Sequence, residues 1–121
     1  MPAHILIVDD QEDVLNTLVR FLTVSGYQPV GLLDFREAKD YIDQTPPDVL
    51  VTDVRLGSYN GLQLAIHLRA ARANAGIVVL SAWDDPNLRQ EAAAVGATYE
   101  LKPLTKEQLV KAVTSVLPSA A

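Results

Sequence analysis

Four short apolar runs in the chain each end in residues that can do chemistry. The residues at these ends are three aspartates, one serine and one lysine: Asp9 and Asp10, Asp53, Ser81 and Lys102. If the runs are parallel strands of one sheet, their carboxyl ends share one edge, and ligands of open α/β sheets bind at that edge. The spacing therefore predicts one small site that combines carboxylates, a hydroxyl and an ammonium group.

The three carboxylates predict a site for a divalent cation. Two unit charges about 4 Å apart repel each other by about 1 kcal/mol in water and by more at lower dielectric, so a cation is needed to offset three of them. Mg²⁺ binds through one or two carboxylates, waters and phosphate oxygens. We expect Asp10 and Asp53 to be direct ligands and Asp9 to act through water. The backbone carbonyl of Arg55 is expected to supply a further oxygen.

Asp53 also has the chemistry of a nucleophile. A carboxylate can form an aspartyl phosphate, and phosphoryl transfer depends mainly on positioning and charge stabilisation. Lys102 and Mg²⁺ would place positive charge around the moving phosphoryl group, and Ser81 would donate a hydrogen bond to one of its oxygens. Pro103 follows Lys102, and a cis Lys102–Pro103 peptide bond would turn the lysine into the pocket.

The elements that position these residues are predicted as five strand–helix pairs. Apolar runs predict strands at residues 4–8, 28–33, 48–52, 77–80 and 97–101. Apolar residues at helical spacing follow each run, with capping signals at Asp34, Asp85 and Thr105. A loop through Gly57 is expected after the third strand, with Asn60 capping the next helix.

Alternating strands and helices imply a parallel sheet with helices on both faces. Only the second strand ends without obvious site chemistry, so it belongs at the edge far from the site. Strand order 2-1-3-4-5 satisfies this condition and brings the first and third strands together at the switch point. The predicted fold is a flavodoxin-like three-layer αβα sandwich, a (βα)5 chain that forms one domain over residues 1–121.

Composition narrows the class of protein. The 121 residues are 49% hydrophobic, contain no cysteine and carry a net charge of −5. No apolar run approaches the roughly 20 residues of a membrane span, and the chain starts without a secretion signal, so we expect a cytoplasmic protein. No cluster of Lys and Arg indicates direct binding of nucleic acid. The negative net charge is explained mainly by solubility, and the residues of an acidic pocket contribute part of it.

The segments that carry this chemistry are ILIVDD at 5–10, VLVTDVR at 49–55 with Gly61 beyond it, VVLSA at 78–82 and GATYELKP at 96–103. They resemble the receiver domain of two-component response regulators, of the chemotaxis type, over essentially the whole chain. The resemblance implies that Asp53 accepts phosphate from a histidine kinase or a histidine phosphotransfer protein. It implies that Asp9 and Asp10 are the acidic Mg²⁺ pair and that Lys102 contacts the phosphoryl group.

The resemblance also implies a switch. Ser81 would move towards the phosphate, the aromatic Tyr99 would rotate inward, and the fourth helix, fifth strand and fifth helix would form the output surface for an effector domain or protein. A phosphorylation-dependent homodimer through that face is a further expectation. Such a domain is a phosphoacceptor and not an enzyme, although it assists its own phosphorylation and dephosphorylation.

One segment departs from the family pattern. Many members carry a Met-Pro-Gly-Met-Asp-Gly type stretch after the phosphoacceptor strand, whereas residues 56–60 here are LGSYN. Without the proline we expect a more flexible loop. Arg55 and Trp83 occupy the positions that flank the phosphoryl group in the family, and a bulky Trp83 would screen the attacking water. This predicts slow self-dephosphorylation.

Each residue also has a purely structural interpretation. Paired acids after a strand are often caps or solvated turn residues, a strand-end serine or lysine is usually unremarkable, and Tyr99 fits half-buried packing as well as a switch. Trp83 is either a hydrophobe over the pocket or an exposed contact residue. It is the joint occurrence at four strand ends that favours the phosphoacceptor.

Two other functions remain open. One is a phosphorylation-independent interaction module on the same fold, supported by the altered loop around Gly57. The other is an enzyme on this fold. A nucleotide enzyme lacks support because neither Gly-rich phosphate motif occurs, and an aspartyl phosphatase would want an acid two residues after Asp53, where Arg55 stands.

Overall fold

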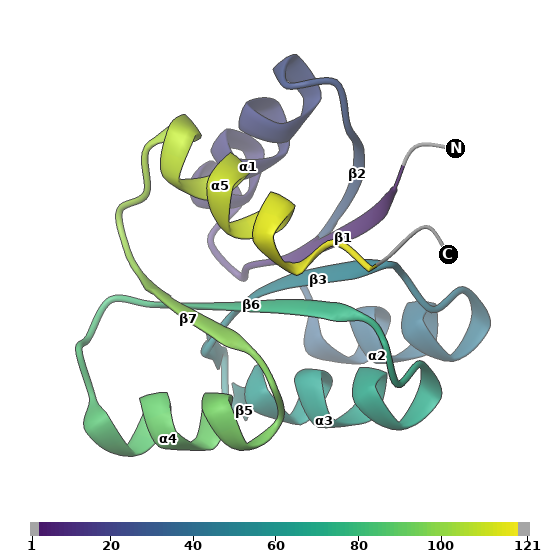
Figure 1. Cartoon of the computed structure of the whole chain (residues 1–121), viewed down its shortest axis with the longest axis vertical. Helices are drawn as coiled ribbons and strands as arrows, with labels where there is room; N and C mark the ends of the chain where they lie inside the picture. The colour runs from purple at the N-terminus through teal and green to yellow at the C-terminus, as the bar shows by residue number, and fades with distance from the viewer. Residues whose placement is uncertain (1–2, 119–121) are drawn as a thin grey trace.

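The computed structural model describes residues 3–118. Within this range, five parallel strands form one sheet between two layers of helices (Figure 1). The sheet strands are β1 (His4–Val8), β2 (Gln28–Leu32), β3 (Val49–Asp53), β6 (Gly76–Ser81) and β7 (Thr98–Leu101). The helices are α1 (Glu12–Val24), α2 (Phe35–Gln44), α3 (Leu62–Ala71), α4 (Pro86–Ala94) and α5 (Lys106–Val116). The remaining strands, β4 (Arg55–Leu56) and β5 (Tyr59–Asn60), form a separate antiparallel hairpin.

The order of strands across the sheet is β2-β1-β3-β6-β7. Counting only the five sheet strands, this is the predicted order 2-1-3-4-5, so the fold prediction is confirmed. β1 pairs with β3 with Val8 opposite Thr52, and β3 pairs with β6 with Asp53 opposite Leu80. The carboxyl ends of these three central strands therefore lie level with one another at one edge of the sheet.

The core consists of two apolar layers, one on each face of the sheet. Successive strand residues point to opposite faces, so Ile5 and Ile7 pack with α1 and α5, whereas Leu6 and Val8 pack with α2, α3 and α4. Figure 1 shows the same division, with α1 and α5 on one side of the sheet. Burial of such side chains contributes about 1.5–3 kcal/mol each, which explains why β1 is apolar on both faces.

The predicted helix starts are largely confirmed. The side chains of Asp34, Asp85 and Thr105 accept hydrogen bonds from the first turns of α2, α4 and α5. The start of α3 differs slightly, because Gly61 occupies the cap position. Asn60 nevertheless accepts a hydrogen bond from the backbone N–H of Leu62 at 2.8 Å, which satisfies one of the free donors of that helix.

The segment after β3 differs from the sequence prediction. Instead of the expected loop, residues 55–60 form the β4–β5 hairpin, which turns at Gly57 with φ of +64°. The positive φ favours glycine at this turn. Several strand bounds also differ by one residue, and two of these bear on the site, since Asp53 and Ser81 are the last residues of β3 and β6 rather than the first residues beyond them.

None of the helices in residues 3–118 is long and apolar enough to cross a bilayer.

Candidate functional site

The residues singled out by the sequence converge at the carboxyl edge of the sheet. Asp9 and Asp10 follow β1, Asp53 ends β3, and oxygen atoms from the three carboxylates all lie within 4.8 Å of one another. Lys102 follows β7, and its Nζ lies 2.7 Å from Asp9 Oδ2 and 3.4 Å from Asp53 Oδ1. Ser81 ends β6 beside them. The ends of four strands of the sheet thus bring five charged or polar groups to one place, two of them from the end of β1.

These groups surround a hollow of about 430 Å³ that opens at the sheet edge. Its lining combines acidic, basic, uncharged polar and apolar residues: Asp10, Gln11, Asp53, Val54, Arg55, Gly57, Ser81, Ala82, Trp83, Asp85, Leu88 and Lys102. Asp9 is buried beneath this surface and is not part of the lining. The hollow has room for a small ion together with a phosphoryl group.

The two acids after β1 have different environments. Asp9 is fully buried, and its carboxylate accepts hydrogen bonds from the Gln11 backbone N–H at 2.9 Å and from Lys102. Asp10 is exposed, and its Oδ2 accepts a hydrogen bond from the Gly57 backbone N–H at 2.9 Å. Asp9 is therefore the buried member of the cluster, fixed by two hydrogen bonds, whereas Asp10 is exposed and is restrained by the segment around Gly57.

Asp53 carries an unfavourable charge in this environment. Burial raises the pKa of its carboxyl group, the Lys102 ammonium opposes this shift, and Asp9 and Asp10 raise the pKa further. The side chain keeps 13% of its surface exposed, so it can be reached from the hollow. A carboxylate that is poorly solvated and partly neutralised by a cation is suited to attack an incoming electrophile.

Ser81, Trp83 and Tyr99 form one hydrogen-bonded chain. The backbone N–H of Trp83 donates to Ser81 Oγ at 3.0 Å, and the Tyr99 hydroxyl donates to the Trp83 backbone carbonyl at 2.5 Å. Tyr99 is half-buried, and the Arg89 guanidinium lies 4.7 Å from its ring centroid. Tyr99 is thus both a packed residue and a residue linked to the site. Its contacts connect the hollow to α4 and β7.

Backbone geometry accounts for two further sequence features. The Lys102–Pro103 peptide bond is cis, as predicted. A Cβ atom on Gly61 would lie 1.9 Å from the Asp53 carbonyl oxygen, so only glycine allows α3 to begin against the end of β3.

Arg55 and Trp83 both line the hollow, and Trp83 is 62% exposed. Trp83 is therefore both a wall of the pocket and an exposed residue.

The donor set fits Mg²⁺. Three ionised carboxylates and one ammonium leave two negative charges in the cluster, which a divalent cation would balance. The donors are oxygen atoms, which Mg²⁺ prefers, and the open side of the hollow leaves room for waters and a phosphate oxygen. The donor types, the charge and the space therefore all agree with the predicted metal.

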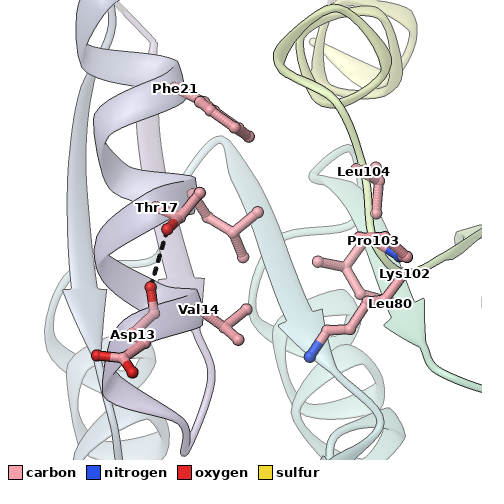
Figure 2. Close-up of a pocket in the computed structure, with 9 residues that line it drawn as sticks. Asp13, Val14, Thr17, Phe21, Leu80, Lys102, Pro103 and Leu104 are labelled. Carbon is pink, nitrogen blue, oxygen red and sulfur yellow. Dashed lines mark hydrogen bonds between the residues drawn. The ribbon is translucent and has the colours of Figure 1, made fainter.

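Two features of the site were missed by sequence reasoning. One is the hydrogen bond from Gly57 to Asp10, for which the only signal was a glycine in an irregular segment. The other is a second, apolar hollow of about 270 Å³ between α1 and the segment that begins at Lys102. Figure 2 shows Val14 and Phe21 of α1 facing Pro103 and Leu104 across it. Lys102 lines both this hollow and the one at the acidic cluster.

The comparisons with known proteins agree with this geometry. Residues 5–114 match the family model of the response regulator receiver domain. The response regulator MprA of Mycolicibacterium vanbaalenii is 36% identical over 118 residues, which cover 97% of this chain and 51% of the relative. The transcriptional regulatory protein PrrA of Mycobacterium leprae is 33% identical over 115 residues, which cover 94% of this chain and 49% of the relative. The chain thus spans about half the length of these curated relatives.

Solved structures give the same result. The chemotaxis protein CheY4 of Vibrio cholerae superposes with a TM-score of 0.88 at 29% identity, covering 97% of this chain and all of that one. A response regulator protein from Burkholderia pseudomallei, solved with a phosphorylated aspartic acid, a calcium ion and citrate, gives a TM-score of 0.84 at 28% identity. That match covers 91% of this chain and 65% of the other. The chain therefore belongs to the family of response regulator receiver domains, which are signalling domains of two-component systems.

Proposed function

We propose that this domain is a phosphoacceptor switch in which Asp53 is the residue phosphorylated. The donor is the phosphohistidine of a histidine kinase or a histidine phosphotransfer protein, and small acyl phosphates can replace it. One oxygen of the Asp53 carboxylate forms the O–P bond while the N–P bond of the phosphohistidine breaks, and the electron pair of that bond returns to the imidazole nitrogen. The observation that carries this proposal is the convergence of Asp53, Lys102 and the acidic pair at one accessible hollow.

The residues around Asp53 have complementary tasks. Lys102 places its ammonium beside the reacting carboxylate, and Ser81 is the hydroxyl donor for a phosphoryl oxygen. Asp9, Asp10, Asp53 and the backbone carbonyl of Arg55 would hold Mg²⁺, which when bound supplies positive charge to the phosphoryl oxygens. Arg55 and Trp83 tune the lifetime of the product. Trp83 screens the attacking water, which makes self-dephosphorylation slow. The domain thus assists only its own phosphorylation and dephosphorylation and does not turn over a separate substrate.

Phosphorylation would be read out through the chain of hydrogen bonds from Ser81 to Tyr99. A phosphoryl group adds about 1.5 to 2 negative charges and three acceptor oxygens, and Ser81 then turns from the Trp83 backbone N–H towards one of them. The segment around Trp83 follows, and Tyr99 moves with it because its hydroxyl is bonded to the Trp83 carbonyl. The face made of α4, β7 and α5 is the proposed output surface.

The output partner is an effector domain or a separate protein that recognises this face. PrrA is named a transcriptional regulatory protein and is about twice as long as this chain, so one possible effector is a further domain that acts in transcription. The receiver domain itself is not proposed to contact nucleic acid or membrane. We also propose that the domain forms a homodimer through the output face after phosphorylation. Its proposed location is the cytoplasm.

The test is phosphorylation by a small donor. We expect incubation with acetyl phosphate and Mg²⁺ to add the mass of one phosphoryl group, and hydroxylamine to remove it. Chelation of Mg²⁺ and Asp53→Asn should each abolish the gain, whereas Asp40→Asn, at an exposed position of α2, should not. A folded chain that takes up no phosphate under these conditions would instead favour the phosphorylation-independent interaction module.

A further inference from the structure

We propose that Tyr59 is a positioning residue for the Asp10 carboxylate, acting through the β4–β5 hairpin, and that it thereby sets the affinity of the site for Mg²⁺. The inference rests on the proposed function, because it assigns to the hairpin a part in the metal site of the phosphoacceptor. Tyr59 is not among the residues that line the hollow, and its hydroxyl bonds to Arg36. Its effect is transmitted by the backbone of residues 57–59.

The hairpin supplies a hydrogen-bond donor to the acidic cluster. In its register Arg55 lies opposite Asn60 and Leu56 opposite Tyr59, and the turn places the Gly57 backbone N–H 2.9 Å from Asp10 Oδ2. A hydrogen bond to an ionised carboxylate is stronger than one between neutral groups. The turn of the hairpin therefore restrains one of the three carboxylates of the cluster.

Tyr59 fastens the hairpin to α2. Its ring stacks on Phe35 with the centroids 4.5 Å apart and the planes 6° from parallel. Its hydroxyl accepts hydrogen bonds from Arg36 Nε at 3.2 Å and from Arg36 Nη2 at 3.0 Å. Phe35 is itself partly buried against the core, so the stack ties the hairpin to a fixed element.

The hairpin needs this attachment. It has only two residue pairs, and an isolated two-stranded hairpin is marginally stable at best in water. Leu56 is buried and holds the first strand, but Gly57, Ser58 and Tyr59 are exposed. Asn60 ties the end of the second strand to α3 through its bond from the Leu62 N–H group, whereas Tyr59 fixes the end that follows the turn, and with it the position of the Gly57 N–H group.

The orientation of Asp10 matters for the metal. Asp10 is exposed, and its carboxylate lies near those of Asp9 and Asp53, which repel it. Without a partner, this exposed carboxylate would be free to turn away from the neighbouring negative charges into water. The bond from Gly57 to Oδ2 holds the carboxylate in the cluster while Oδ1 stays free for a cation. Groups that orient metal ligands in this way change metal affinity about 10–100-fold when they are removed.

The experiment is a titration of the whole chain with Mg²⁺, followed by the backbone amide signals in ¹H–¹⁵N NMR spectra. Tyr59→Ala should raise the Kd for Mg²⁺ about three- to tenfold, less than removal of a direct partner of a ligand because Tyr59 acts through the backbone. The Gly57 amide proton should shift upfield in the metal-free variant, since its hydrogen bond to Asp10 weakens. Arg36→Gln should raise the Kd in the same direction but by less. Arg36 is exposed, so this variant tests the proposal even if Tyr59→Ala does not fold.

Tyr27→Ala is the matched control, because it removes the same side chain from a partly buried position that lies before β2, away from the carboxyl edge of the sheet where the cluster lies. It should leave the Kd unchanged. A Tyr59→Ala variant with the wild-type Kd and an unshifted Gly57 amide would overturn the inference, and so would an equal rise in Kd for Tyr27→Ala. If the wild type is phosphorylated in either case, the proposed function stands. Absence of saturable Mg²⁺ binding to the wild type would overturn both.

Discussion

Replacing Lys102 with methionine would show how much the ammonium group contributes to holding three acidic side chains together. Asp9 is fully buried with its Oδ2 2.7 Å from Lys102 Nζ, whereas the Lys102 side chain is 17% exposed. Removing one partner of a buried ion pair typically costs about 3–5 kcal/mol, because the other charge is left without compensation. Since water still reaches Lys102, we expect a loss near the lower limit, about 3 kcal/mol in the free energy of unfolding.

Urea unfolding at pH 7 without Mg²⁺ measures this loss. A domain of this size has a free energy of unfolding of about 5–15 kcal/mol, so a loss of about 3 kcal/mol is a large fraction of it. Lys106→Met is the matched control, because Lys106 is an exposed lysine at the start of α5, and we expect a change within about 0.5 kcal/mol. Saturating Mg²⁺ should restore part of the stability of Lys102→Met, because it offsets the same carboxylates.

The pH dependence gives a second check. Burial already raises the pKa of Asp53 while Lys102 lowers it, so the variant should have a still higher pKa at Asp53. A carboxyl group with a raised pKa in the folded state favours folding less as pH rises through that pKa. The stability difference between wild type and Lys102→Met should therefore shrink at acid pH. A variant as stable as wild type at pH 7, or a difference that grows on acidification, would refute the reasoning.

Three other changes have defined outcomes. Asp53→Asn should raise the free energy of unfolding at pH 7 in the absence of Mg²⁺, because the pKa of Asp53 is raised in the folded state, and this gain should vanish as pH falls; a loss of stability at pH 7 would contradict it. Trp83→Ala should shorten the lifetime of the phosphoaspartate, followed as decay of the phosphorylated mass, and an unchanged lifetime would count against screening by Trp83. Arg69→Met removes a guanidinium that donates to four backbone carbonyls in the α3–β6 loop and just after α4. We expect a loss of about 2 kcal/mol by urea unfolding, and a change within error of zero would show that water replaces these bonds.

Local patterns were sufficient to predict most of the fold. Strand β1 could be placed at residues 4–8 because both of its faces are buried, and a strand of that kind is apolar at every position. Asp34 and Thr105 marked helix starts because a cap acts within three residues of itself. The strand order followed from where the polar residues ended the runs, and this is why Asp9, Asp53 and Lys102 could be expected together.

The rest depends on contacts between residues distant in sequence. The β4–β5 hairpin takes its position from Asp10, which is 47 residues from Gly57, and from α2, which Tyr59 contacts. Nothing in the local sequence of residues 55–60 specifies either partner. Proximity of Lys102 to the acids was predictable, but its closest approach to the buried Asp9 rather than to Asp53 depends on side-chain packing. Both interpretations of Trp83 apply, and this could not be predicted because its exposure depends on how the surrounding segments pack.

The measurement that tests the central claim most directly is the location of the phosphate. The chain is phosphorylated with acetyl phosphate and Mg²⁺, the acyl phosphate is reduced with borohydride, and peptides are sequenced by mass spectrometry. The account predicts that the aspartate at position 53, and no other residue, is converted to homoserine. Conversion at Asp9 or Asp10, or a reduction-resistant phosphate on Ser81, would contradict it.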